Sequence, residues 1–188
     1  FSLIPLFLIT GPFLTDLSVS IISLLFLTYC FKKKNFSYFK NKYFYFFLFF
    51  WIYLVVNSFF NNVNFSSIKI SLSYIRYGIF VIAIIYVLNK DEKILKYFFY
   101  VLFFTFFLLV GDGFLQYITG KNIFGWELIY PGPRVSSFFG EELILGSFIT
   151  RFFPILVAII FFLNFQKNKI SIFLLITLSS MFVVLISG

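Results

Sequence analysis

The chain has 188 residues and a formal net charge of +8, yet it is 61% hydrophobic and only 12% charged. Soluble domains carry about 25% charged residues, so this chain cannot cover a soluble protein's surface with polar groups. The single cysteine, Cys30, excludes an internal disulfide framework and a cysteine-based zinc site, and no histidine is present to act as a general base. The composition predicts a polytopic membrane protein.

Apolar runs follow one another along the chain, and most have about 17–21 residues, long enough as helices to cross a hydrocarbon core of about 30 Å. They do not alternate polar and apolar residues, as the strands of an outer-membrane barrel would. We therefore predict an all-α integral membrane protein, a bundle of about six to seven transmembrane helices. The runs lie at 1–11, 13–31, 43–60, 70–88, 97–115, 143–163 and 170–187.

The two ends of the chain both look cut. The first run is short and ends at Gly11-Pro12, so we expect a truncated span or one leg of a helical hairpin. Residue 1 is not methionine, and Gly188 directly follows an apolar run. We therefore expect 1–188 to be a single transmembrane domain, the N-terminal part of a longer polytopic protein.

Lysines on alternate loops set the expected orientation. They gather at 32–42, at 90–96 and at 167–169, two spans apart each time. Short loops rich in lysine stay on the cytoplasmic side of the membrane. The longest external loop, about 116–142, is therefore expected on the opposite side.

The arginines all fall toward that external side. Arg134 is in the long loop, whereas Arg76 and Arg151 are expected about 9 and 12 Å inside their spans. Guanidinium groups keep their charge and bind phosphate through two parallel hydrogen bonds. Together the three predict a site for a lipid-linked phosphate or diphosphate. The alternative is that Arg76 and Arg151 extend to the lipid headgroups and pair with nearby acidic residues.

The nearby acidic residues also have two interpretations. Glu141 and Glu142 are expected in the first turn of a helix starting at Ser136-Ser137, where carboxylates complement the helix dipole by about 0.3–1 kcal/mol. Alternatively, a glutamate here orients an arginine or accepts a proton from a sugar hydroxyl. Backbone N–H groups at this helix start would favour an anion beside Arg134. Asp112 is expected as a helix-end residue or an arginine partner.

Residues 112–151 resemble the O-antigen ligase and O-antigen polymerase superfamily of bacterial envelope enzymes. The resemblance lies in Asp112, in "QYITGKNIFG" from Gln116 to Gly125, and in "RVSSFFGEELILGSF" from Arg134 to Phe148. The opening "LITGPFLTDLSVSI" and "SYIRYGIF", which contains Arg76, fit the same pattern. The rest of the chain matches in hydropathy and span order.

This resemblance implies a membrane glycosyltransferase fold of the GT-C-like type in the bacterial inner membrane. It implies transfer of a glycan from undecaprenyl diphosphate to a sugar acceptor on the periplasmic side. The acceptor would be lipid A-core, as in lipopolysaccharide biosynthesis, or a growing glycan. No nucleotide sugar, metal or other cofactor is implied; the partners are membrane lipids and lipid-linked glycans, with no nucleic acid.

The resemblance also assigns roles to particular residues. Arg134 corresponds to a loop arginine that helps bind the diphosphate, and Arg76 and Arg151 match intramembrane basic positions. Arg134, Glu141 and Glu142 form the candidate catalytic set. Members of the superfamily carry further arginines and a histidine in a later external loop, so we expect this segment by itself to lack a complete active site.

Two other classes of protein remain open. A transporter or a flippase for lipid-linked glycans would share a basic, outward-facing cavity, but such proteins often show inverted repeats and broken helices near the midplane. The sequence shows no repeat, and its charges gather near the outer leaflet, which favours the transferase. A structural or assembly subunit would leave the arginines singly exposed.

Overall fold

The computed structural model describes residues 1–61, 65–127, 134–140 and 142–163, with Phe173, Thr177, Ser179, Ser180 and Phe182. Over these residues the regular structure is helical, and Lys121 and Glu127 form an isolated β-bridge. Five helical segments of the described chain are long and apolar enough to cross a membrane. The predicted helical fold and the helices long enough to cross a membrane are confirmed for the described residues, and the GT-C-like type stays a prediction. The expected last span, 170–187, lies largely outside the described residues.

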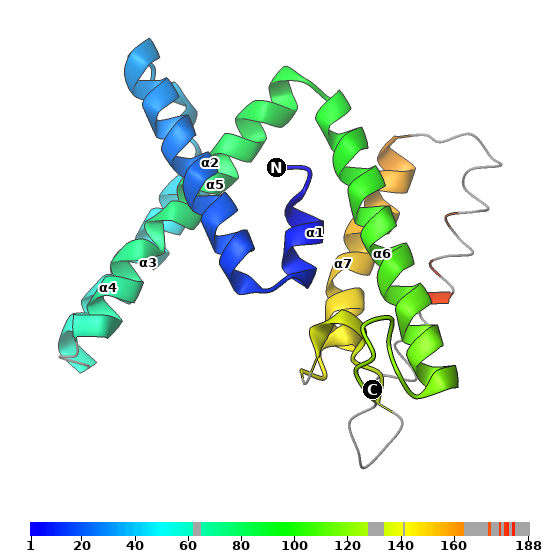
Figure 1. Ribbon diagram of the computed structural model, residues 1–188. Helices are drawn as coiled ribbons and strands as arrows, with labels where there is room; N and C mark the ends of the chain where they lie inside the picture. The colour runs from blue at the N-terminus through cyan, green and yellow to red at the C-terminus, as the bar shows by residue number, and fades with distance from the viewer. Residues whose placement is uncertain are drawn as a thin grey trace. The chain divides into compact units, whose positions relative to one another are not determined.

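The helices follow the apolar runs with shifted ends (Figure 1). The span predicted at 70–88 begins at Phe65, and the span predicted at 97–115 occupies 93–119. In chain order the elements are α1 (Ile4–Ile9), α2 (Pro12–Lys33), η1 (Ser37–Phe39), α3 (Lys42–Asn61), α4 (Phe65–Ser73), α5 (Ile75–Lys90), α6 (Lys93–Thr119), η2 (Ser137–Phe139) and α7 (Leu145–Phe162).

The first apolar run forms the short helix α1 and a turn into α2. At six residues, α1 is far shorter than a membrane span. Gly11 has φ +115°, a backbone conformation that glycine adopts readily. Pro12 occupies the first position of α2, where its missing N–H would have no partner within the helix. Helix α1 contacts α6 of its own unit, and the choice between a truncated span and one leg of a helical hairpin stays a prediction.

The chain divides into two compact units, one of Phe1 with Thr15–Glu92 and one of Ser2–Leu14 with Lys93–Gly188. In the first unit, α2, α5 and η1 meet around buried Phe26, Cys30 and Ile82. Helix α3 contacts α4 and α5, and it approaches α5 closely at Gly78, where a Cβ would overlap the Phe47 ring. Small residues at such crossings let membrane helices pack tightly.

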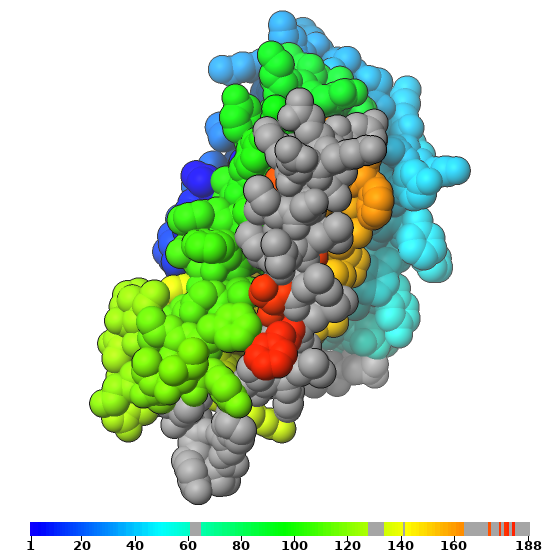
Figure 2. Space-filling view, turned by 90° about the vertical axis from the view of Figure 1, so that its right-hand side faces the viewer, coloured from blue at the N-terminus to red at the C-terminus, as the bar shows by residue number. Residues whose placement is uncertain are grey.

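In the second unit, α6 forms the centre and contacts α1, α7 and η2. Its side chains Phe99, Phe106 and Leu109 are fully buried in one apolar cluster with residues of α7. Figure 2 shows part of the surface of α6 in green. Phe104 and Phe107 are about half exposed on this helix. Outward-facing aromatic side chains of this kind suit a lipid environment.

The orientation inferred from the lysines can be tested with cysteine probes. In a Cys30→Ala background, we expect Ile123→Cys to react in intact cells with a membrane-impermeant maleimide, because its side chain is 61% exposed in the external loop. Lys33→Cys, exposed at the end of α2, should react only after permeabilisation. The opposite labelling pattern would reverse the sidedness of every loop.

Candidate functional site

The loop that follows α6 is fastened to that helix by a buried carboxylate. Asp112 is 1% exposed, and its two oxygens accept hydrogen bonds from the Ser137 hydroxyl at 2.6 Å and the Ile123 backbone N–H at 2.8 Å. It lies seven residues before the helix end at Thr119 and pairs with no arginine in the described chain. Both expectations for Asp112 were therefore wrong: it anchors two later segments of the loop.

Gln116, one helical turn further along α6, holds the same segment. Its side chain is fully buried, and its Oε1 accepts the backbone N–H groups of Ser136 at 3.0 Å and Ser137 at 2.8 Å. The expected anion site at this helix start is therefore wrong, because both amides already donate to Gln116. Moreover, η2 has only three residues and supplies little helix dipole.

Asn122 closes the loop that follows α6. Its amide donates to the Ser137 carbonyl at 3.0 Å, and its Oδ1 accepts the Trp126 N–H at 2.8 Å. Across the same turn, Lys121 and Glu127 form a 2.9 Å ion pair, but both side chains are more than half exposed. Exposed pairs contribute about 0–1 kcal/mol, so the buried amide matters more than the ion pair. Asp112, Gln116, Asn122 and Ser137 are called the loop anchor below.

The two glutamates do not begin a long helix. Gly140, with φ +61°, follows η2, and α7 begins only at Leu145, with no acidic residue in its first turn. Glu142 is exposed and precedes α7, so its expected role at the helix dipole was wrong. Glu141 lies outside the described residues, and its expected catalytic and dipole roles stay predictions.

Arg134 and Arg151 lie in the same unit, on segments that pack together. Val135, beside Arg134, is buried in one cluster with Phe148 and Ile149 of α7. Both arginines are exposed, and within the described chain neither forms an ion pair. Arg151 is the seventh residue of α7, about 9 Å from its start rather than the 12 Å expected.

Arg76 instead has a carboxylate partner. Its guanidinium donates to Asp16 Oδ2 at 2.9 Å and to the hydroxyls of Ser20 and Tyr77, each at 3.2 Å. The Tyr77 hydroxyl in turn donates to Asp16 Oδ1 at 2.9 Å. Asp112 and Glu142 were therefore wrong as expected partners, and Glu141 lies outside the described residues. The missed signal was Asp16 itself, a charge four residues into an apolar helix.

The position of Arg76 also differs from the expectation. Because its span begins at Phe65, Arg76 is about 16 Å along the helix rather than 9 Å. It belongs to the Thr15–Glu92 unit, whereas Arg134 and Arg151 belong to the other. Its Nε is buried with no hydrogen-bond partner in the described chain. The joint diphosphate site of the three arginines stays a prediction.

Comparison with models of protein families, with curated proteins and with solved structures found no match for this chain. The resemblance carried by residues 112–151 accordingly stays a prediction. In the described chain, no group of three or more His, Cys, Asp and Glu residues could hold a metal ion. What defines the site is therefore its own geometry: an exposed arginine next to a loop anchored by buried hydrogen bonds.

The loop anchor predicts a local loss of order when its acceptors are removed. Asp112→Ala and Gln116→Leu each leave two donors of the loop unsatisfied, at about 1–3 kcal/mol for each buried group. We expect amide hydrogen exchange at Ile123, Ser136 and Ser137 to accelerate about tenfold or more. Glu127→Gln, which breaks only the exposed ion pair, is the control. Equal exchange in all three variants would mean that the network does not hold the loop.

The Arg76–Asp16 pair predicts coupling between α2 and α5. Asp16→Ala should destabilise the protein by about 1–2 kcal/mol, because it leaves an arginine in the membrane without its counter-charge. Adding Arg76→Leu should restore part of this loss. Thermal unfolding of the single and double variants in lipid nanodiscs measures the coupling. Strictly additive effects would show that the two charges stabilise the protein independently.

Proposed function

We propose that this protein transfers a glycan from undecaprenyl diphosphate to a sugar acceptor, as O-antigen ligases and polymerases do. The reaction takes place on the periplasmic face of the bacterial inner membrane, in a fold of the GT-C-like type. One observation carries the proposal: the loop anchor holds the segment that bears Arg134 against the end of a membrane helix, and leaves the arginine exposed.

The charge of Arg134 is available for a ligand. No carboxylate of the described chain pairs with it, and none pairs with Arg151, so both charges can meet a diphosphate. Arg76 differs, because Asp16 already balances it. The proposal therefore assigns the leaving group to Arg134 and Arg151, and gives Arg76 mainly a part in holding the helices together.

The reaction needs charge stabilisation more than acid catalysis. The acceptor hydroxyl oxygen attacks the anomeric carbon, and the bond from that carbon to the diphosphate oxygen breaks. Undecaprenyl diphosphate departs with the bonding electron pair, and its growing negative charge is stabilised by the guanidinium groups. The acceptor proton passes to a base. Glu142 is assigned this role, because it is exposed and outside the helix.

Substitution of Arg134 in the full-length protein tests the proposal. Arg134→Ala should lower glycan transfer by about 10²–10³-fold, and Arg134→Lys should lower it clearly, because lysine keeps the charge but lacks the two-pronged donor. Lys121→Ala removes a positive charge from the same loop and should leave transfer unchanged. The assay follows transfer from the lipid diphosphate donor in membranes at matched protein levels.

Each failure has a distinct meaning. Normal transfer by Arg134→Ala would remove the role of Arg134, and full activity of Glu142→Gln would remove Glu142 as the base. Movement of the donor across the membrane without cleavage of its diphosphate bond would instead identify a flippase.

A further inference from the structure

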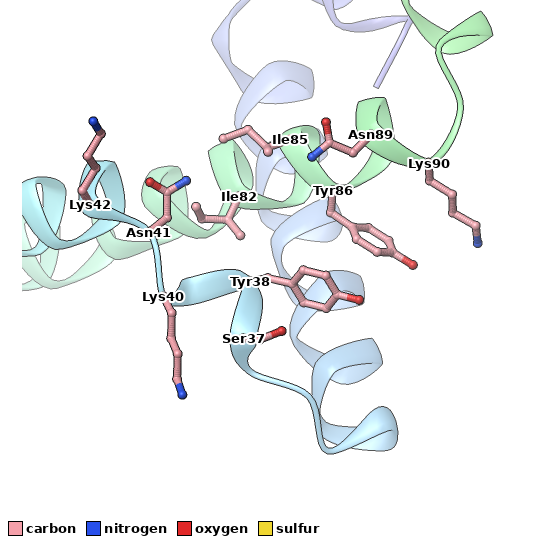
Figure 3. Close-up of a pocket in the computed structure, with 10 residues that line it drawn as sticks. All are labelled: Ser37, Tyr38, Lys40, Asn41, Lys42, Ile82, Ile85, Tyr86, Asn89 and Lys90. Atoms are coloured by element: carbon pink, nitrogen blue, oxygen red, sulfur yellow. The ribbon is translucent and has the colours of Figure 1, made fainter.

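A cavity of about 720 Å³ opens in the Thr15–Glu92 unit, far along the chain from the arginine-bearing loop (Figure 3). It is lined by η1, by the start of α3 and by the last turns of α5. Three spans have an end near it in sequence: α2 ends at Lys33, α3 begins at Lys42 and α5 ends at Lys90. Ends of membrane spans lie at the level of the lipid headgroups.

One part of the cavity wall is apolar and aromatic. Ile82 and Ile85 of α5 line it together with Tyr38 and Tyr86. The two tyrosine rings pack edge to face, with their centroids 4.9 Å apart. The Tyr86 hydroxyl donates a hydrogen bond to the Tyr29 hydroxyl at 2.7 Å, which holds the Tyr86 ring in place. This wall offers contacts to the glycerol and upper acyl carbons of a lipid, and nothing to a small inorganic ion.

The other part of the lining is cationic. Lys40, Lys42 and Lys90 line the cavity, and no acidic side chain does. Figure 3 shows the three lysine side chains extending outward from the rim in different directions. None of them forms an ion pair within the described chain, although Asp91 and Glu92 follow Lys90 directly. Ammonium groups on flexible stems can converge on a phosphate from such positions.

Two asparagines complete the lining. The Asn41 Oδ1 accepts the Tyr43 N–H at 3.0 Å, so this residue caps α3 and holds the first turn in place. Asn89 is exposed on the last turn of α5, beside Lys90. Its amide is a neutral donor suited to a phosphate or glycerol oxygen.

We propose that this cavity, which we call the lysine-rimmed pocket, binds the headgroup of an anionic phospholipid. The phosphate lies among the three lysines, and the glycerol and acyl carbons lie against the aromatic wall. Basic pockets between membrane helices on the cytoplasmic side bind lipid headgroups in this way. The lysine distribution places the pocket in the cytoplasmic leaflet. The site is independent of the proposed transferase.

Lipid binding to the purified full-length protein in detergent tests the pocket. Native mass spectrometry measures the affinity for phosphatidylglycerol, with phosphatidylcholine as the neutral lipid and inorganic phosphate as the free anion. The triple variant Lys40→Gln, Lys42→Gln, Lys90→Gln should lose about tenfold or more in affinity for phosphatidylglycerol. The control carries Lys32→Gln, Lys33→Gln and Lys34→Gln, an equal charge loss at the end of α2, and should bind as before.

A second variant separates the cavity from its charge. Ile85→Trp adds bulk to the lining without changing charge, and should also weaken phosphatidylglycerol binding. Equal losses in the two lysine triples would overturn the pocket in favour of general attraction to basic loops. Unchanged binding in Ile85→Trp, or equal affinity for phosphatidylcholine, would overturn it too. Displacement of the lipid by inorganic phosphate would show that the site takes a free anion.

Discussion

A buried carboxylate, that of Asp112, seven residues before the C-terminal end of α6, is the constraint on which the candidate site depends. Burying an ionised carboxyl group costs several kcal/mol unless hydrogen bonds compensate it. The compensation for Asp112 comes from Ile123 and Ser137, which lie 11 and 25 residues later in the chain. Gln116 accepts two more buried hydrogen bonds, from backbone N–H groups of the same stretch. The C-terminal part of α6 thus holds these described loop segments, because separating them would leave buried polar groups without hydrogen-bond partners.

The arginines illustrate two ways in which a membrane protein accommodates a cation. Arg76 is neutralised by Asp16 within a ring of hydroxyl groups, and its backbone carbonyl accepts the Ser23 hydroxyl at 2.9 Å. Such a pair joins α2 to α5 and leaves little charge for a ligand. Arg134 and Arg151, by contrast, form no ion pair with any carboxylate of the described chain.

Hydropathy predicted the five span-length helices of the described chain, and it misplaced some of their polar ends for a physical reason. The run predicted to end at 115 continues as helix to Thr119, because Gln116 is polar but satisfied inside the protein. At 65–69 a lysine and two serines interrupted the apolar pattern, yet α4 forms there. Ser71 donates back to the Ser67 carbonyl, which satisfies a hydroxyl within the helix itself. A scale of transfer energies cannot include partners that only the fold supplies.

The partners of the charged side chains were harder still to predict, because they depend on contacts distant in sequence. Asp16 and Arg76 are 60 residues apart, and spacing within a helix carries no information about such a pair. Gly140 did carry a local signal, because a glycine after Ser-Ser-Phe-Phe favours a break rather than a continuing helix. Because the helix breaks there, Glu142 does not lie in the first turn of a helix. The backbone amides of the two serines donate to Gln116 and not to a ligand. Among the described residues of this loop, Arg134 has the paired donors that suit a phosphate best, so the proposed contact with a diphosphate is assigned to its guanidinium.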